Sequence, residues 1–420
     1  PLDYAMLPQL ADVVDRAIFA RAYATSYGGN DTVDNMVAGD SQTITAGQSG
    51  IVSVMSGGQQ DISSGGTGTV STMNNGGSQF VDDGGTGAVS TMSGGKQKMY
   101  AGTGTIGTMS GGSQAVYEGG TAIVDKMLAG EQNIEYGGMG TVSSMSGGTQ
   151  KVWIGGTGTI GTMSGGSQKV NSGGSGMVST MNSGTQQIWV DGIGTISTMS
   201  SGLQDISSGG AGTVGVMLDG HQFVDVGGMG TVSIMSGGSQ RIFESGMGTI
   251  DIMSDGSQVM SGGTGTINTM NSGLQWLLSG GTGTIDVMHD GLQDIRSGGT
   301  GTIDTMNGGR QYIASGGTGT VDIMSGGSQN IVSGGAGTIN TMIDGYQTIS
   351  SGCTGTVSAM NGGWQTISSG GAGMVSTMDG GRQYIASGGT GTISSLLGGI
   401  HDIQNGGTAL DTVIAGGTQL

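Results

Sequence analysis

Few side chains in this sequence have the chemistry of a catalytic or metal site, and they lie far apart along the chain. The three histidines are His221, His289 and His401, and the single cysteine is Cys353. Their spacing suggests neither a Cys–His pair nor a Ser–His–Asp set, so nucleophilic and acid–base catalysis lack their usual side chains. We therefore expect a protein that is not an enzyme and carries no cofactor.

Glycine-rich stretches are typical of two kinds of ligand site, the phosphate loop and the calcium-binding β-roll. No G-x-x-x-x-G-K-S/T motif occurs, however. A calcium β-roll needs a carboxylate in every repeat, whereas Asp286, Asp304 and Asp322 belong to only some repeats. The sequence thus predicts neither a phosphate loop nor a metal site.

The composition excludes several classes of partner. Of the 420 residues, 96 are Gly and 10% are charged, and the formal net charge is −18. So acidic a chain repels phosphate backbones, and we expect no nucleic-acid partner. No apolar run reaches the length of about 18 residues that a spanning helix needs, so we expect no membrane insertion by this segment.

A repeat of about 18 residues organises the chain from residue 28 to residue 420. Its consensus is S-G-G-T-G-T-(I/V)-S-T-M-S-G-G-S-Q-x-(I/V)-x, and its Met recurs from Met36 to Met378 before Leu396 and Val413 replace it. These 22 units have 16 spacings of 18 residues, two of 19 and three of 17. So strict a period indicates that each unit contacts its neighbours in much the same way.

Three columns of the repeat predict which side chains face inward. Ile or Val stands three residues before the Met in 21 units, Gln stands after it in 21 units, and a second apolar column follows two residues after the Gln. Strand alternation places the Gln and that apolar residue on one face. An inward Gln in every unit can form an amide ladder with the Gln above and below, and His401 interrupts it once. Because the first Ile and the Met are three apart, either a bend or bulge lies between them or the Met lies at a corner.

Two strand-forming segments per unit, separated by Gly-Gly turns, predict an all-β fold. Repeated Gly and β-branched residues exclude a helical solenoid, the spacing of Gly excludes collagen, and columns kept in phase argue against disorder. We predict a single-stranded parallel β-solenoid of about 22 rungs, one unit per rung.

Residues 1–27 do not follow the repeat. Leu10, Val13, Val14, Ile18 and Phe19 have helical spacing. We expect a short helical segment that is either a cap over the first rung or a remnant of a preceding segment.

Aromatic and basic residues of the repeats gather around the segment that follows each Gly-x-Gln. The candidate contact face comprises Phe80, Tyr100, Tyr117, Trp153, Trp189, Phe223, Phe243, Trp276, Tyr312, Trp364 and Tyr384. Eight of the 11 basic residues share this band. Such a face fits contact with another copy, a glycan or a host surface. The alternative is that outward positions of a strand vary freely and favour β-forming residues.

The unit S-G-G-T-G-T-(I/V)-x-x-M-x-x-G-x-Q-x-(I/V) resembles the passenger repeat of AIDA-type self-associating autotransporter adhesins over about residues 28 to 420. The resemblance implies a right-handed β-helix on the cell surface of a Gram-negative bacterium, or released outside the cell. It also implies adhesion, autoaggregation or biofilm formation through self-association or contact with a host or bacterial surface. The Met column departs from the aliphatic or Thr residues expected there.

Members of that family are often heptosylated on Ser and Thr by a dedicated heptosyltransferase, which the resemblance makes a partner during biogenesis. Candidate acceptors, taken to be residues of the turns, are Ser64, Thr67, Ser110, Ser172, Ser261 and Thr264.

Our functional hypothesis is an adhesin passenger that acts through a lateral face of the solenoid. The main alternative is a structural filament or surface-layer component. A remote alternative is an ice-binding solenoid in which the Thr-Gly-Thr segments form a flat column of threonines. Against this alternative, the second Thr of each segment directly precedes a buried Ile, which we expect at a turn.

Overall fold

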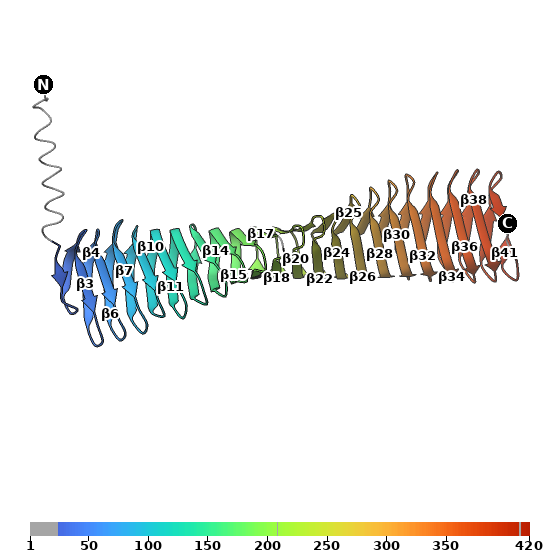
Figure 1. Ribbon diagram of the computed structural model, residues 1–420. Coiled ribbons are helices and arrows are strands. Elements are labelled where there is room, and N and C mark those ends of the chain that lie inside the picture. The colour runs from blue at the N-terminus through green and yellow to red at the C-terminus, as the bar shows by residue number, and fades with distance from the viewer. Residues whose placement is uncertain (1–23, 208, 411–412) are drawn as a thin grey trace, which may run out of the picture. The chain divides into compact units, whose positions relative to one another are not determined.

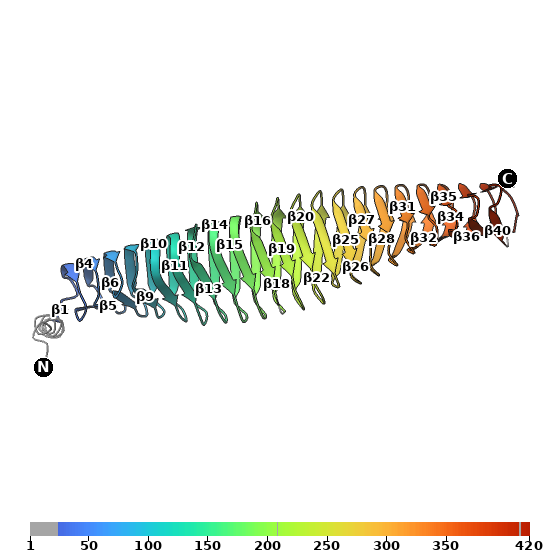
Figure 2. The same ribbon diagram turned by 90° about the horizontal axis from the view of Figure 1, so that it is seen from above.

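The computed structural model describes residues 24–207, 209–410 and 413–420, so the helix expected before residue 24 lies outside the described residues. The chain divides into two compact units, unit 1 (Pro1–Ser197) and unit 2 (Thr198–Leu420). Each unit is a stack of β-strand rungs (Figure 1, Figure 2). Most rungs have a long strand that ends at the Met and a short strand around the Gln. Each pairs in parallel with its counterpart in the next rung, as β4 pairs with β6 and β5 with β7. The predicted all-β parallel solenoid is confirmed.

The long strands of unit 1 are β2 (Thr32–Met36), β4 (Ser49–Met55), β6 (Thr67–Met73), β8 (Thr86–Met92) and β12 (Met139–Met145). Its short strands are β1 (Ser26–Tyr27), β3 (Ser41–Ile44), β5 (Gln59–Ile62), β7 (Ser78–Val81), β9 (Lys96–Met99) and β13 (Thr149–Val152). Four rungs run both segments together as β10 (Thr103–Val116), β11 (Thr121–Ile134), β14 (Thr157–Val170) and β15 (Ser175–Ile188). β16 (Ile193–Met199) spans the division between the units. Because β1 pairs with β3, the solenoid includes Ser26 and Tyr27.

Unit 2 repeats the pattern. Its long strands are β18 (Ala211–Met217), β20 (Met229–Met235), β22 (Met247–Met253), β24 (Thr264–Met270), β26 (Thr282–Met288), β28 (Thr300–Met306), β30 (Thr318–Met324), β32 (Ala336–Met342), β34 (Thr354–Met360), β36 (Ala372–Met378), β38 (Thr390–Leu396) and β40 (Thr408–Leu410). Its short strands are β17 (Leu203–Ile206), β19 (His221–Val224), β21 (Ser239–Ile242), β23 (Ser257–Ser261), β25 (Leu274–Leu278), β27 (Leu292–Ile295), β29 (Arg310–Ile313), β31 (Ser328–Ile331), β33 (Tyr346–Ile349), β35 (Trp364–Ile367), β37 (Arg382–Ile385), β39 (Ile400–Ile403) and β41 (Thr418–Gln419).

The rung of β28 and β29 shows how the columns build the core. Ile303, Met306 and Ile313 are all fully buried. The expected bend lies between Ile303 and Met306, because the ladder to β30 pairs Ile303 and Thr305 but omits the residue between them. The bend returns the Met to the inside, where apolar burial stabilises the rung by roughly 25 cal/mol per Å². Gly301 completes the packing, since a Cβ there would lie 2.5 Å from Ile295 Cδ1.

The buried glutamines form the predicted amide ladder. Each Gln Nε2 donates to the Gln Oε1 of the preceding rung, from Gln42 to Gln186 in unit 1 at 2.7–2.9 Å. From Gln204 to Gln383 in unit 2 the distances are 2.6–2.8 Å. Gln311 Nε2 also donates to the Thr320 carbonyl at 3.2 Å, which ties the short strand to the next long strand. Buried amides that are satisfied in this way fix one register for all rungs.

Turns with positive φ connect each short strand to the next long strand. In Ala314–Gly317 the Gly317 N–H donates to the Ala314 carbonyl at 3.0 Å, and Ser315 and Gly316 have φ values of 52° and 75°. Two successive positive φ values define a type I′ turn, which matches the twist of strands.

Candidate functional site

The outward side chains of the short strands form one lateral face in each unit, which we call the short-strand face. It consists of the residues directly before and after the inward Gln and the residue after the inward apolar side chain. In β29 and the position that follows, these are Arg310, Tyr312 and Ala314. Alternation around the buried Gln and Ile forces these three positions outward in every rung. Most side chains at these positions are exposed or half-buried, although a few, such as Ala314 and Asp294, are buried between their neighbours on adjacent rungs.

The structure places the eleven predicted aromatic side chains on this face. Six are exposed, namely Tyr100, Trp153, Trp189, Phe243, Trp276 and Trp364. Five are half-buried, namely Phe80, Tyr117, Phe223, Tyr312 and Tyr384. They occupy three outward columns rather than one row, so only neighbours along a column or diagonal meet. Tyr100 and Tyr117 stack with ring centres 4.8 Å apart, and Phe223 and Phe243 meet edge to face at 6.2 Å.

Lysine and arginine side chains lie over aromatic rings of the adjacent rung. The cation–ring distances are 5.5 Å for Lys98–Phe80, 5.8 Å for Lys169–Trp189, 5.7 Å for Arg241–Phe223, 5.8 Å for Arg296–Tyr312 and 5.2 Å for Arg382–Trp364. Exposed contacts of this kind contribute about 0.5–1 kcal/mol each. Sequence reasoning missed these pairs, although basic and aromatic residues spaced by roughly one repeat length carry the signal.

Ion pairs between outward residues of the short strands occur in both units. In unit 1, Lys151 Nζ lies 2.9 Å from Glu131 Oε1, and this hydrogen bond is the main cause that lowers the pKa of Glu131. In unit 2, Arg296 pairs with Asp294 at 2.8 Å. Arg382 pairs with Asp402, and its hydrogen bond lowers the pKa of that carboxyl. Because each pair links residues of this face, the cations also shape its surface charge.

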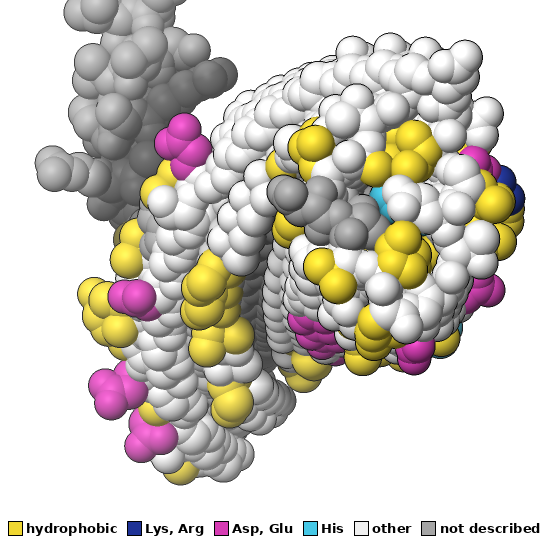
Figure 3. Space-filling model, turned by 90° about the vertical axis from the view of Figure 1, so that its right-hand side faces the viewer, with side chains coloured by type: hydrophobic (Ala, Val, Ile, Leu, Met, Phe, Trp, Pro, Cys, Tyr) yellow, Lys and Arg dark blue, Asp and Glu magenta, His cyan; other side chains and the backbone are white. Residues whose placement is uncertain are grey.

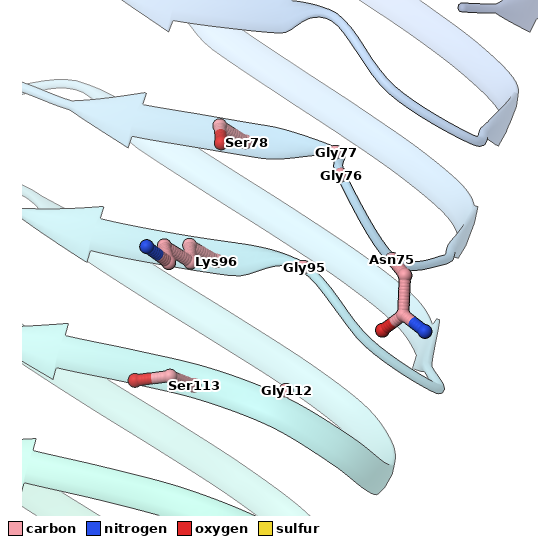
Figure 4. Close-up of a pocket in the computed structure, with 8 residues that line it drawn as sticks. All are labelled: Asn75, Gly76, Gly77, Ser78, Gly95, Lys96, Gly112 and Ser113. Carbon is pink, nitrogen blue, oxygen red and sulfur yellow. The ribbon is translucent and has the colours of Figure 1, made fainter. Parts of the chain in front are cut away.

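A shallow groove runs beside the short-strand face where the long strands turn into the short ones. In unit 1 it has a volume of about 440 Å³ and is lined by Asn75, Gly76, Gly77, Ser78, Gly95, Lys96, Gly112 and Ser113 (Figure 4). Lys96 stands on the strand between those of Ser78 and Ser113. A groove in unit 2 of about 370 Å³ is lined by Asp290, Gly291, Leu292, Gly309, Arg310 and Ser328. The small glycines hollow the surface beside a cation in both units.

The candidate acceptor residues are accessible, but most are not turn residues. Ser64, Thr67, Ser110, Ser172 and Thr264 are exposed, and Ser261 is half-buried. Only Ser64 and Ser172 lie in turns. Thr67 and Thr264 begin β6 and β24, Ser261 ends β23, and Ser110 lies within β10. The placement in turns was wrong for these four residues because the strands extend further toward the Gly-Gly pairs than the composition indicates.

The Thr-Gly-Thr segments are also straighter than expected. Thr266 and Ile267 lie inside β24 rather than at a turn, so that expectation was wrong. Thr264 is exposed and Thr266 half-buried, which places both hydroxyls on the outward side of the long strand.

Three aspartates, Asp286, Asp304 and Asp322, each follow the first buried Ile or Val of three successive long strands in unit 2. Burial is the first cause that raises the pKa of Asp304, followed by the charges of Asp286 and Asp322. Across residues 24–207, 209–410 and 413–420, no three His, Cys, Asp or Glu side chains are grouped to hold a metal ion.

The histidines and the cysteine occupy unrelated environments. His221 Nδ1 lies 2.7 Å from Ser239 Oγ on the short-strand face, and His289 lies 3.5 Å from Asn307 Nδ2. His401 is fully buried in the glutamine column, where burial lowers its pKa. Cys353 is buried at a turn position that is glycine in most repeats.

No helix in the described part of the chain is both long and apolar enough to cross a membrane.

Comparison with known proteins gives one likeness to report. A scan against models of protein families and a search of curated proteins find no match. Among solved structures, the chain is similar to a TibC-catalysed hyper-glycosylated fragment of TibA, at 20% identity and with a TM-score of 0.20. The alignment covers 94% of this chain and 96% of that one. A likeness at this TM-score supports no conclusion about the present chain, and the proposals below rest on its own residues.

Proposed function

We propose that this chain is the passenger of a surface-exposed bacterial adhesin and that it binds through the short-strand face. The observation that carries the proposal is the contrast between a uniform interior and a varied lateral face. Isoleucine, methionine and glutamine recur inside nearly every rung, whereas aromatic and basic side chains concentrate outside on the short strands. Exposed aromatic side chains are typical of surfaces that bind macromolecules.

Exposed apolar side chains support contact with another large surface. In unit 1, Trp153, Trp189 and the adjacent Ile154 and Val190 are 40%, 37%, 57% and 52% exposed. Trp153 with Ile154 and Trp189 with Val190 form two exposed apolar pairs, two rungs apart along the solenoid. Exposed apolar side chains of this size mark protein or surface contacts. Adhesion, autoaggregation and biofilm formation, on the outside of a Gram-negative cell, follow as the functions to test.

The test displays the chain on non-aggregating bacteria and compares their sedimentation with that of cells that display no passenger. The proposal predicts clumping by the displaying cells. It fails if these cells stay dispersed and the purified chain instead assembles into ordered fibres, the outcome that the structural-filament alternative predicts. An ice-binding role would require thermal hysteresis from the purified chain.

We also propose glycosylation of exposed Ser and Thr by a heptosyltransferase during biogenesis. Support comes from the accessible hydroxyls of Ser64, Thr67 and Ser172 on a surface with few charged groups, where added sugars would limit pairing with other chains. The mass of natively produced protein tests this. Added sugar increments are expected, and a mass equal to that of the bare 41.3 kDa chain would contradict it.

A further inference from the structure

We infer that unit 1 carries a binding site for an acidic saccharide, a sugar chain bearing carboxylate or sulfate groups. The inference rests on the proposed adhesive function and gives it a ligand class and a location. The site lies on three successive short strands, β7, β9 and the second half of β10. We call it the Lys96 patch, and it consists of Ser78, Lys96, Lys98, Tyr100, Ser113 and Tyr117.

Two lysines concentrate positive charge at the centre of the patch. Lys96 and Lys98 are both outward residues of β9, and neither has an ion-pair partner within the part of the chain that the structure describes. Lys98 Nζ lies 5.5 Å from the Phe80 ring centre, which holds its charge over the strand. The molecule as a whole has a net charge of −18 and repels anions, so a local excess of cations selects where an anion can bind.

Serine hydroxyls and a groove surround Lys96, at the start of the short strands. Ser78 and Ser113 flank Lys96 on the neighbouring strands, and all three line the groove of about 440 Å³ (Figure 4). That volume falls within the range of small-molecule sites, which is about 300–1,000 Å³. Ser hydroxyls both donate and accept hydrogen bonds, as recognition of sugar hydroxyls requires.

Two stacked tyrosine rings, Tyr100 and Tyr117, lie just after the ends of β9 and β10 and form an aromatic platform. The Tyr100 and Tyr117 rings are parallel to within 4°, and Tyr100 is 41% exposed. The acids of these rungs are Asp82, Asp83 and Glu118. Asp82 occupies the same outward column as Tyr100 on the adjacent rung, and Asp83 and Glu118 lie at the turns, so all three are at the end of the short strands away from Lys96. An anionic group therefore fits at Lys96 and a sugar ring fits against the tyrosines. Protein and nucleic-acid partners would not need this pairing of a hydroxyl-lined groove with a short platform.

The experiment measures binding of the full chain by calorimetry to four probes, a sulfated tetrasaccharide, a tetragalacturonate, neutral maltotetraose and inorganic sulfate. The double variant Lys96→Gln, Lys98→Gln should bind the acidic tetrasaccharides at least about tenfold more weakly, because two charge-assisted contacts are lost. The double variant Lys96→Arg, Lys98→Arg should stay within about threefold of wild type. The matched control Lys151→Gln, Lys169→Gln alters the same face outside the patch and should leave affinity unchanged.

The inference is overturned if neither acidic tetrasaccharide binds, if maltotetraose binds equally well, or if the control pair loses affinity to the same extent. Inorganic sulfate that binds as tightly as the tetrasaccharides would also overturn it, because the patch would then hold an anion alone. The cell-clumping assay separates this inference from the proposed function. Clumping without saccharide binding rejects the Lys96 patch and leaves adhesion, whereas saccharide binding without clumping rejects adhesion and leaves the patch.

Discussion

At the scale of single residues, the buried glutamine is the side chain that most distinguishes this core from an ordinary apolar one. Its amide has partners on both sides. Removing one glutamine leaves the Oε1 of one neighbour without its donor and takes one acceptor from the Nε2 of the other, which keeps main-chain carbonyls as acceptors, as Gln329 does. Leaving such groups unpaired costs about 1–3 kcal/mol for each group, whereas the net gain from one hydrogen bond is only about 1 kcal/mol. The column is therefore more sensitive to substitution than its neutral polar character suggests.

We predict that Gln311→Met lowers the free energy of unfolding by about 2–4 kcal/mol, although the side chain keeps its volume. Gln293 Oε1 and Gln329 Nε2 both lose their partner at Gln311. Denaturant unfolding measures the change, and Ser328→Ala, on the outward side of the next strand, is the control. Equal stability of Gln311→Met and wild type would contradict the ladder.

His401 provides the converse test. Gln383 Oε1 and both His401 ring nitrogens are buried with no hydrogen-bond partner among the described residues. His401→Gln should extend the ladder by one rung and stabilise the rung of β39 by about 1–2 kcal/mol. Hydrogen exchange at the amides of Ile400–Ile403 measures this, and faster exchange in the variant would refute it.

The same histidine predicts a pH dependence. Burial lowers the folded-state pKa of His401 below its unfolded value of about 6.5, so the unfolded chain binds the proton more readily. The stabilising contribution is complete above about pH 6.5 and is lost as pH falls below it. His401→Gln should remove this part of the acid sensitivity, and identical pH profiles of both proteins would contradict the assignment.

At the scale of the strand, one outward column of the long strands in unit 2 places negatively charged aspartates next to one another. Asp286, Asp304 and Asp322 occupy equivalent positions at the bends of β26, β28 and β30, between residues that pair in the ladder. Elsewhere in the column an amide relieves the repulsion, since Asn340 Nδ2 donates to Asp322 at 2.7 Å and Asn268 Nδ2 to Asp251 at 3.1 Å. Asp304 alone has an acid on both sides.

Asp304→Asn should therefore stabilise unit 2 at neutral pH, by only a few tenths of a kcal/mol because the side chain is exposed and salt screens it. The folded-state pKa of Asp304 is raised, so stability falls as pH rises from about 4 through that pKa. The variant should lack this loss. Thermal melts at pH 4 and pH 7 measure it, with Asp251→Asn as a control that removes the partner of Asn268 and should bring no gain.

The features that recur with the repeat could be predicted from the sequence, whereas features that depend on local backbone or side-chain conformation could not. The Ile, Met and Gln columns, the bend and the amide ladder follow from spacing, because one inward face must repeat in every rung. Turn conformation does not follow from it. Ser315 has a positive φ, whereas Ser369 in the equivalent turn is absent from the residues with positive φ. Cation–ring pairs such as Lys169–Trp189 also depend on side-chain rotamers, which a repeat pattern does not specify.

At the scale of the whole molecule, repetition replaces a single large core. Each rung contacts only its neighbours, so stability is the sum of many similar interfaces, and outward residues can vary at little cost. The last described rung of unit 2 has exposed apolar side chains. Val413, Ile414 and Leu420 are 62%, 51% and 66% exposed, and the space-filling view that faces this end shows uncovered hydrophobic side chains there (Figure 3). Lateral faces, in contrast, are free to specialise for contact.

The measurement that tests the account most directly compares clumping by cells that display two matched double variants. Trp153→Ser with Trp189→Ser alters the short-strand face, where these side chains are 40% and 37% exposed. Ile51→Ser with Met177→Ser alters the outward face of the long strands at similar exposure, 41% and 42%. With equal display of all proteins, we predict that the first pair slows sedimentation at least about fivefold, as hot-spot aromatics do when removed, and that the second pair leaves it unchanged. Equal loss in both pairs, or no loss in the first, would contradict the assignment of contact to the short-strand face.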